Sequence, residues 1–277
     1  MSRATESLRE AWERDGFCML REFLSQGDCD VCQRLCDSVL RQARAADPRL
    51  ADSTNIAWLT QPRYWQDDPQ GLTRLLALIA APKAAGLIRS LTGETPLFNN
   101  TQYFAEPLTK SWFGLWHRDC QFLAVDEAGE QAIMNRFIGI HLHIALIADD
   151  SLAYVPGSHR RKDRPEERRV RRAADPGMRS NGTIPGAETV RLDAGDAVLF
   201  NAWGIHRGRY DPARPRRTLD ILYQTGDLCR EAPPPPTCFE DPALMAGLPR
   251  DVQAFFQRFV DGYAPFWVSG RYVRPSP

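Results

Sequence analysis

The stretch that decides the fold is AGDAVLFNAWGIHRGRYDPARPRRTLDILY, residues 194–223. Its Gly-Asp pair at 195–196 predicts a turn, and the apolar run 197–200 that follows is typical of a buried strand. That strand leads to His206, and after a stretch rich in Asp, Pro and Arg a second strand is expected over residues 218–223. Short strands separated by turns favour a β-sandwich or jelly roll over a parallel sheet with crossover helices.

The same pattern extends back to Pro96. Further strand-like runs are LFNNTQYF (97–104), FIGIHLHIAL (137–146) and ETVRL (188–192). Residues 159–181, HRRKDRPEERRVRRAADPGMRSN, are rich in arginine and have no hydrophobic period. We interpret them as a solvated loop between strands, with a mobile lid or a cationic wall for an anionic substrate as the alternative.

The residues before Pro96 predict helices instead. Ser25 or Asp28 is expected to cap a helix that runs to about Ala45, and a second helix fits Asp68 to Ser90. The sequence therefore predicts a mainly β fold with flanking helices.

We expect a single domain over residues 1–277. Its parts are a helical N-terminal buttress (1–95), a β core (96–226) and a C-terminal extension (227–277). In this extension, the polyproline run 233–236 is expected to leave the core as an extended segment, and a final amphipathic helix around residues 249–261 is expected to pack back.

Composition excludes several classes of protein. Lys and Arg total 35, as do Asp and Glu, so the net charge is zero and a nucleic-acid partner is not expected. We find no apolar stretch of signal-peptide length at the start of the sequence and none of membrane-spanning length later, which predicts a cytoplasmic protein without a membrane partner.

The 7 cysteines are irregularly spaced. Cys29, Cys32 and Cys36 share one helical face, and we interpret them as buried core thiols, not cluster ligands.

A candidate metal site begins at the tripeptide His117-Arg118-Asp119. In an extended strand, residues two positions apart point to the same side, so His117 and Asp119 are expected to converge. His206 would add a second imidazole from another strand. Two histidines and one carboxylate form the ligand set of non-heme Fe(II) oxygenases.

Other residues near these candidates are open to more than one interpretation. His141 and His143 alternate with apolar residues on one strand, and we weigh them as rival ligands, as residues that line the pocket or support the ligands, or as satisfied positions without a role. His159 is interpreted as structural, bonded to the backbone of its own loop. The aromatic residues near the ligands either shape an apolar pocket or belong to the core; they are Trp112, Phe113, Trp116 and Trp203.

Arg216 follows His206 by ten positions and opens the next predicted strand. If the two strands pair through the intervening loop, both side chains lie at the same barrel mouth. An arginine presents two parallel donors to a carboxylate, so Arg216 could anchor a dicarboxylate whose other end chelates the metal.

Taken together, these motifs resemble a known family. WHRD (116–119), YVPGSHR (154–160), GDAVLF followed by His206, and the Arg-Arg-Thr-Leu sequence at 216–219 are similar to the phytanoyl-CoA dioxygenase family of Fe(II)- and 2-oxoglutarate-dependent oxygenases. WERDGFCMLREFLS (12–25) resembles the family's opening helix and strand. The resemblance implies a double-stranded β-helix, the cupin-like jelly roll.

The resemblance also implies roles for individual residues. His117, Asp119 and His206 would be the iron ligands. Arg216, in preference to Arg217, would bind the far carboxylate of 2-oxoglutarate. Asn100 and Gln102 are candidates for further contacts with this co-substrate.

The expected reaction uses Fe(II), 2-oxoglutarate and O2, and yields succinate and CO2. Relatives that halogenate lack the carboxylate ligand, so Asp119 favours hydroxylation, desaturation or ring formation. We expect a small-molecule substrate, with a secondary-metabolite intermediate preferred over an acyl-CoA.

A non-catalytic metal-binding jelly roll is a further alternative. A protein kinase is rejected, because the asparagine expected five residues after Asp119 is replaced by Ala124.

Overall fold

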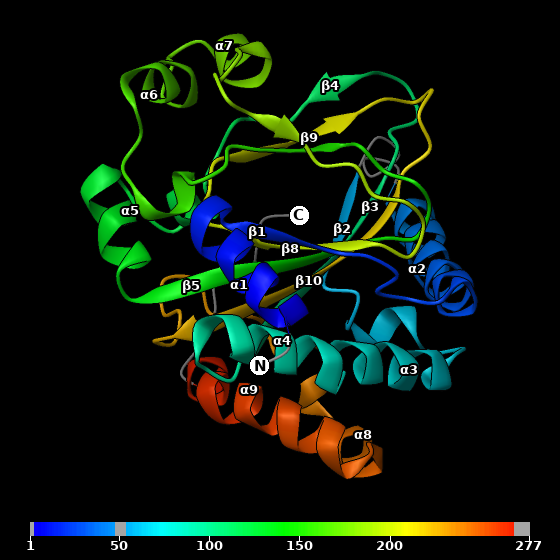
Figure 1. The fold of residues 1–277 in the computed structure, drawn as a ribbon. Coiled ribbons are helices and arrows are strands. Elements are labelled where there is room, and N and C mark those ends of the chain that lie inside the picture. Colours follow the sequence, from blue (N-terminus) through cyan, green and yellow to red (C-terminus); the bar gives the residue numbers. More distant parts are fainter. Residues whose placement is uncertain (1–2, 48–53, 269–277) are drawn as a thin grey trace.

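The computed structural model describes residues 3–47 and 54–268. Two antiparallel sheets form its centre (Figure 1), one with the strand order β1-β8-β5-β10-β3-β2 and the other with the order β4-β9-β6-β7. The strands are β1 Phe17–Leu20, β2 Asn55–Ala57, β3 Leu97–Ala105, β4 Trp112–Phe113, β5 Phe137–Ala145, β6 Leu152–Tyr154, β7 Glu188–Thr189, β8 Ala197–Asn201, β9 His206–Tyr210 and β10 Arg217–Gly226. The expected jelly roll is confirmed, and the N-terminal part contributes strands β1 and β2 to the larger sheet.

Helices cover the outer face of the larger sheet (Figure 1). The helices on this side are α1 Arg3–Asp15, α2 Gln26–Ala46, α3 Pro69–Ile79, α4 Pro82–Thr92, α8 Pro242–Gly247 and α9 Arg250–Val268. The other helices are α5 Glu127–Met134, α6 Pro165–Arg171 and α7 Pro176–Asn181, and α7 contacts β4 of the smaller sheet. The main apolar core lies between the outward-facing residues of β3, β5 and β10 and helices α2, α3, α4 and α9. Because the helices hold more residues than the strands, the description of the fold as mainly β needs this correction.

Helix α2 follows the sequence prediction. The Ser25 hydroxyl accepts a hydrogen bond from the backbone N–H of Asp28 at 3.2 Å, so Ser25 is the cap. Cys29, Cys32 and Cys36 are buried free thiols on the inner face of this helix. Their interpretation as core residues is confirmed.

The expected helix over residues 68–90 is two helices, α3 and α4, and the prediction of one was wrong. Proline disfavours helical geometry in the residue before it, and Ala81 has an extended ψ of 127° before Pro82. The whole stretch Pro69–Thr92 is long and apolar enough to cross a membrane by length and composition, which corrects the expectation that no segment reaches that length. Here many of its apolar residues, such as Leu75, Leu76 and Ile88, are buried in the core.

The arginine-rich segment is also more ordered than a solvated loop. It forms α6 and α7, and Arg171 is buried with ion pairs of 2.8 Å to both Glu130 and Asp163. Glu130 and Asp163 are charged residues outside helix α6, and hydrophobic periodicity does not report ion pairs with such residues. The sequence pattern therefore did not predict these helices. The polyproline run departs from expectation too, since residues 233–235 are buried.

Candidate metal centre and its cavity

The two candidate histidines come from segments that pair through their backbones. His117 and His206 form an isolated antiparallel bridge, with N–H···O distances of 3.0 and 2.9 Å. Asp119 does not continue this strand as expected: it begins a short 3-10 helix, Asp119–Phe122, and its backbone N–H donates to the carbonyl of Ala202 at 3.0 Å. The turn brings the carboxylate back toward the two imidazoles.

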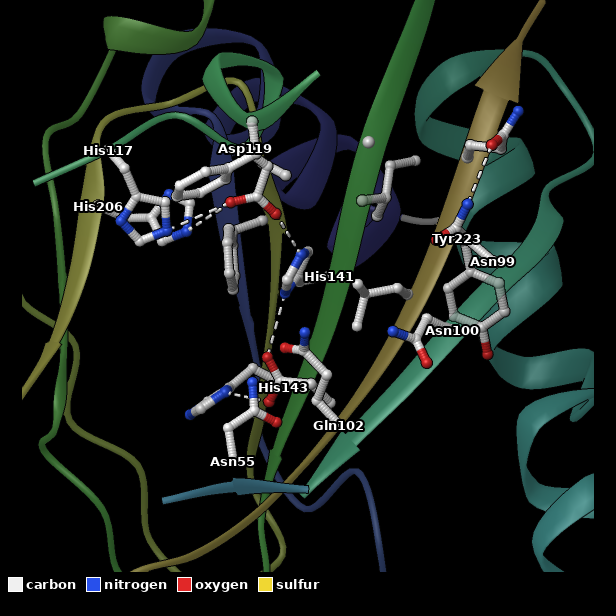
Figure 2. Close-up of a pocket in the computed structure, with 18 of the residues that line it drawn as sticks. Asn55, Asn99, Asn100, Gln102, His117, Asp119, His141, His143, His206 and Tyr223 are labelled. Atoms are coloured by element: carbon white, nitrogen blue, oxygen red, sulfur yellow. Dashed lines mark hydrogen bonds and ion pairs between the residues drawn. The ribbon is translucent and has the colours of Figure 1, made fainter. Parts of the chain in front are cut away.

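The three side chains converge on one point, as Figure 2 shows. Their possible ligand atoms all lie within 4.8 Å of one another. Oδ1 of Asp119 is 3.3 Å from Nε2 of His117 and 3.4 Å from Nε2 of His206. The sequence prediction that these residues meet is therefore matched by their positions.

The outer nitrogens of the two rings are occupied by backbone carbonyls. Nδ1 of His117 is 2.7 Å from the carbonyl oxygen of Leu115, and Nδ1 of His206 is 2.9 Å from that of Gly204. A carbonyl only accepts, so each Nδ1 carries a proton, and in the neutral ring each Nε2 presents a lone pair. Two lone pairs and a carboxylate oxygen that face one another are the arrangement that a cation satisfies.

The electrostatics agree with this arrangement. Burial works against ionisation of Asp119, but contacts with the imidazoles of His117, His141 and His206 outweigh it and hold its pKa well below the usual value. Burial, assisted by the nearby imidazole of His117, lowers the pKa of His206. An ionised carboxylate and a neutral imidazole are the forms that bind a metal ion.

The donor set fits Fe(II). Two imidazole nitrogens and one carboxylate oxygen on one side of a metal leave its remaining coordination positions free, as in the non-heme Fe(II) oxygenases. In the described part of the chain, this is the one group of His, Cys, Asp and Glu side chains that could hold a metal ion.

A cavity of about 540 Å³ opens beside these three residues, between the two sheets. Arg216 lies in its wall, buried between the rings of Phe104 and Tyr210, whose centroids are 4.5 and 5.1 Å from the guanidinium carbon. Its Nε contacts Oγ1 of Thr218 at 3.2 Å, and its Nη1 is buried without a hydrogen-bond partner among the described residues. A carboxylate that entered the cavity could accept a hydrogen bond from Nη1.

Arg217 points the other way. It bonds Glu106 and forms a 2.9 Å ion pair with Asp37, outside the cavity. Of the two arginines that the sequence left open, Arg216 is therefore the one placed to bind a carboxylate in the cavity. One expectation was wrong: His206 opens β9 in the smaller sheet and Arg216 precedes β10 in the larger one, so their strands do not pair with each other.

Asn100 and Gln102 lie on β3 and both line the cavity. Asn100 uses its Oδ1 to accept from the backbone N–H groups of Trp58 at 3.2 Å and of Thr101 at 2.7 Å. A β-bulge in the pairing of β3 with β10 adds Asn99 to the same wall. Sequence analysis missed Asn99, because strict alternation would place it on the opposite face.

His141 and His143 also line the cavity, on β5. Neither belongs to the group of convergent ligand atoms, so they are not rivals of His117 and His206. Both contact Asp220, which the sequence analysis did not single out. A carboxylate inside the otherwise apolar run TLDILY was the available signal.

The remaining candidates divide between cavity and core. Trp203 lines the cavity, and Gly139 leaves the space for its ring, since a Cβ there would lie 3.0 Å from the indole. Trp116 is buried in a separate apolar cluster, and Trp112 and Phe113 are exposed. His159 is buried but leaves its Nδ1 without a partner among the described residues, so the expected backbone bond from this atom is absent.

Several known proteins share this fold. The crystal structure of EctD from S. alaskensis with 2-oxoglutarate and 5-hydroxyectoine matches with a TM-score of 0.59, at 19% identity, over 91% of this chain and 86% of that one. AviO1 from Streptomyces viridochromogenes Tue57 matches with a TM-score of 0.56, at 18% identity, over 83% and 99% of the two chains. The α-ketoglutarate-dependent epimerase SnoN from nogalamycin biosynthesis matches with a TM-score of 0.53, at 19% identity, over 82% and 84%.

These likenesses establish the fold, while a search of curated proteins finds no match. Family membership rests on the sequence itself: the family described as phytanoyl-CoA dioxygenase (PhyH) matches residues 12–214. Its members depend on Fe(II) and 2-oxoglutarate, with O2 as co-substrate. This chain therefore belongs to the phytanoyl-CoA dioxygenase family and is an Fe(II)/2-oxoglutarate-dependent dioxygenase.

Proposed function

We propose that this enzyme oxidises an uncharged intermediate of secondary metabolism, with His117, Asp119 and His206 as its iron ligands. The observation that carries the proposal is the cavity itself, which has three convergent ligand atoms at one place and the free Nη1 of Arg216 at another. When bound, iron with 2-oxoglutarate and O2 supplies the oxidising power. The chain's own residues bind, orient and shield the reactants.

The assigned roles follow from position. Arg216 binds the far carboxylate of 2-oxoglutarate, held in place by Thr218 and by the two rings around it. Gln102 and Asn100 supply amide contacts along β3. Asp119 keeps the carboxylate ligand, which favours hydroxylation or a related oxidation over halogenation.

The cavity lining supports an uncharged substrate. Among the described residues that line it, Arg216 is the one Lys or Arg side chain. The arginine-rich segment does not line it, and its buried Arg171 is engaged by Glu130 and Asp163. A coenzyme A ester would find no further cation there for its phosphates, so this alternative has less support. One of the structural neighbours named above, the epimerase SnoN, acts in nogalamycin biosynthesis, which is in line with this substrate class.

We also propose that the enzyme acts in the cytoplasm. Within residues 3–47 and 54–268, the one long apolar stretch is Pro69–Thr92, and it contributes its buried residues to the core.

The test is succinate formation from 2-oxoglutarate with Fe(II) under air, with and without a panel of neutral ring compounds and acyl-CoA esters. We expect neutral ring compounds to stimulate turnover, and Asp119→Ala to abolish it. A protein that binds iron but produces no succinate with any compound would support the non-catalytic alternative. Stimulation by acyl-CoA alone would overturn the proposed substrate class.

A further inference from the structure

The two carboxylate oxygens of Asp119 face different neighbours. Oδ1 is the atom near Nε2 of His117 and of His206, at 3.3 and 3.4 Å. Oδ2 lies 2.9 Å from Nε2 of His141. A carboxylate oxygen accepts, so Nε2 of His141 is the donor in this contact. One oxygen is therefore directed at the proposed ligands, and the other is held by a hydrogen bond.

His141 is itself fixed in place. Its Nδ1 lies 3.1 Å from Oδ2 of Asp220, and its ring packs against Phe200 with a centroid distance of 4.7 Å. The register of β5 and β10 sets Asp220 opposite His143, two positions along the strand from the residue opposite His141 and therefore on the same face. Asp220 therefore reaches both histidines, with Oδ1 2.5 Å from Nδ1 of His143. Figure 2 shows His141 between Asp119 and His143.

Packing alone does not account for these polar residues. His141, His143 and Asp220 are all buried within the sheet. Burying such groups has a desolvation cost, and apolar side chains of similar volume would fill a sheet interior at least as well. The contact of His141 with Asp119 connects this buried polar group to a proposed metal ligand.

We propose that His141 and Asp220 are positioning residues for the metal centre. His141 holds Asp119 so that Oδ1 alone is presented to the metal, and Asp220 holds the imidazole of His141 in the orientation this requires. The inference rests on the proposed function, in which Asp119 is a ligand. A carboxylate that is held in this way occupies one coordination position and leaves room for 2-oxoglutarate and O2.

The experiment compares two amide replacements of the same histidine. The amide nitrogen of glutamine can take the place of Nε2, whereas that of asparagine takes the place of Nδ1 and falls short of Asp119. We expect His141→Asn to weaken the binding of Fe(II), titrated without oxygen and without 2-oxoglutarate, by roughly 10- to 100-fold. His141→Gln should retain most of the affinity. The visible spectrum of the Co(II)-substituted protein should change in His141→Asn and stay close to that of the wild type in His141→Gln.

His143→Asn is the matched control, since His143 shares the strand and the partner Asp220 but does not contact Asp119. It should leave the Fe(II) affinity and the Co(II) spectrum unchanged. Asp220→Ala should weaken Fe(II) binding, and adding His141→Asn to it should cause little further loss, because Asp220 acts through His141.

The possible outcomes distinguish the positioning role of His141 from the metal site itself. If His141→Asn binds Fe(II) as tightly as wild type and gives the same Co(II) spectrum, while His117→Ala loses the metal, the positioning role is overturned and the metal site stands. If His117→Ala also binds normally, the proposed metal site itself is wrong. Equal losses in His141→Asn, His141→Gln and His143→Asn would indicate a general packing defect and would also overturn the positioning role.

Discussion

Arg216 lines the cavity, where its Nε lies 3.7 Å from Oδ1 of Asp149, whereas Arg217 pairs with Asp37 outside the cavity, and this difference can be tested directly. Arg216→Gln removes the buried guanidinium whose Nη1 has no partner, and a charged hydrogen bond of this kind contributes roughly 1.5–3 kcal/mol. We expect the KM for 2-oxoglutarate to rise by about 10- to 100-fold, while Fe(II) binding stays the same. Arg217→Gln is the control and should leave this KM unchanged. A larger effect of Arg217→Gln would reverse the assignment.

His159 provides a prediction about pH. Burial, together with the nearby cations of Arg160 and Arg118, lowers the pKa of His159 to about 4. A histidine whose folded pKa is depressed is neutral in the folded protein, so its contribution to stability is present above the unfolded pKa and is lost as the pH falls toward 4. Between pH 7 and pH 5 this group should remove roughly 2 kcal/mol from the free energy of unfolding.

Urea denaturation at several pH values measures this effect. His159→Gln, which does not titrate, should show a smaller decline in stability over the same interval. Parallel curves for the two proteins would show that His159 does not carry the change.

At the scale of elements, two of the three arginines of helix α6 lie in very different settings. Arg171 has a side chain that is 1% exposed and pairs with Glu130 and Asp163, whereas Arg168 is 63% exposed and pairs with Glu127. Removing one partner of a buried ion pair leaves uncompensated charge, so Arg171→Met should destabilise the protein by about 3–5 kcal/mol. Arg168→Met should cost less than about 1 kcal/mol. Thermal or urea unfolding compares the two.

The same element shows where sequence patterns stop being informative. Helices α2 and α9 were predictable, because their buried residues recur with the helical period. Helix α6 is stabilised by charge pairs with residues outside it such as Glu130, and no local pattern reports such partners. The break between α3 and α4 was readable, since Pro82 stands in the middle of the stretch, but apolar periodicity on both sides hid it.

At the scale of the whole molecule, the proposed metal ligands join the two sides of the jelly roll, since His206 begins a strand of the smaller sheet and His141 holds Asp119 from the larger one. A ligand that binds only the folded protein stabilises it by mass action, by about 2.7 kcal/mol at 100 times its Kd. We therefore expect Fe(II), added without oxygen, to raise the melting temperature of wild type. His206→Ala should abolish this increase. An equal increase in both proteins would place the bound metal elsewhere.

The family motifs predicted residues that meet at one cavity because these motifs are short and local: His117 and Asp119 are two positions apart, and Arg216 follows a turn. What they could not give is the partner of each residue across the sheets. Asp220 meets His141 only through the register of β5 with β10, and Asn99 enters the cavity only through a bulge. Both depend on pairings between strands far apart in the chain.

The backbone bridge between His117 and His206 has a consequence for how the enzyme acquires its metal. Two hydrogen bonds already close the long segment between these residues, so the entropy of closing that loop is lost during folding and not on metal uptake. The metal-free protein should therefore already be folded around the site, unlike small domains that fold only when they bind their ion. Chelation should empty the site and leave the amide protons of the bridge protected from exchange with solvent, so that one folded chain can be stripped and reloaded many times.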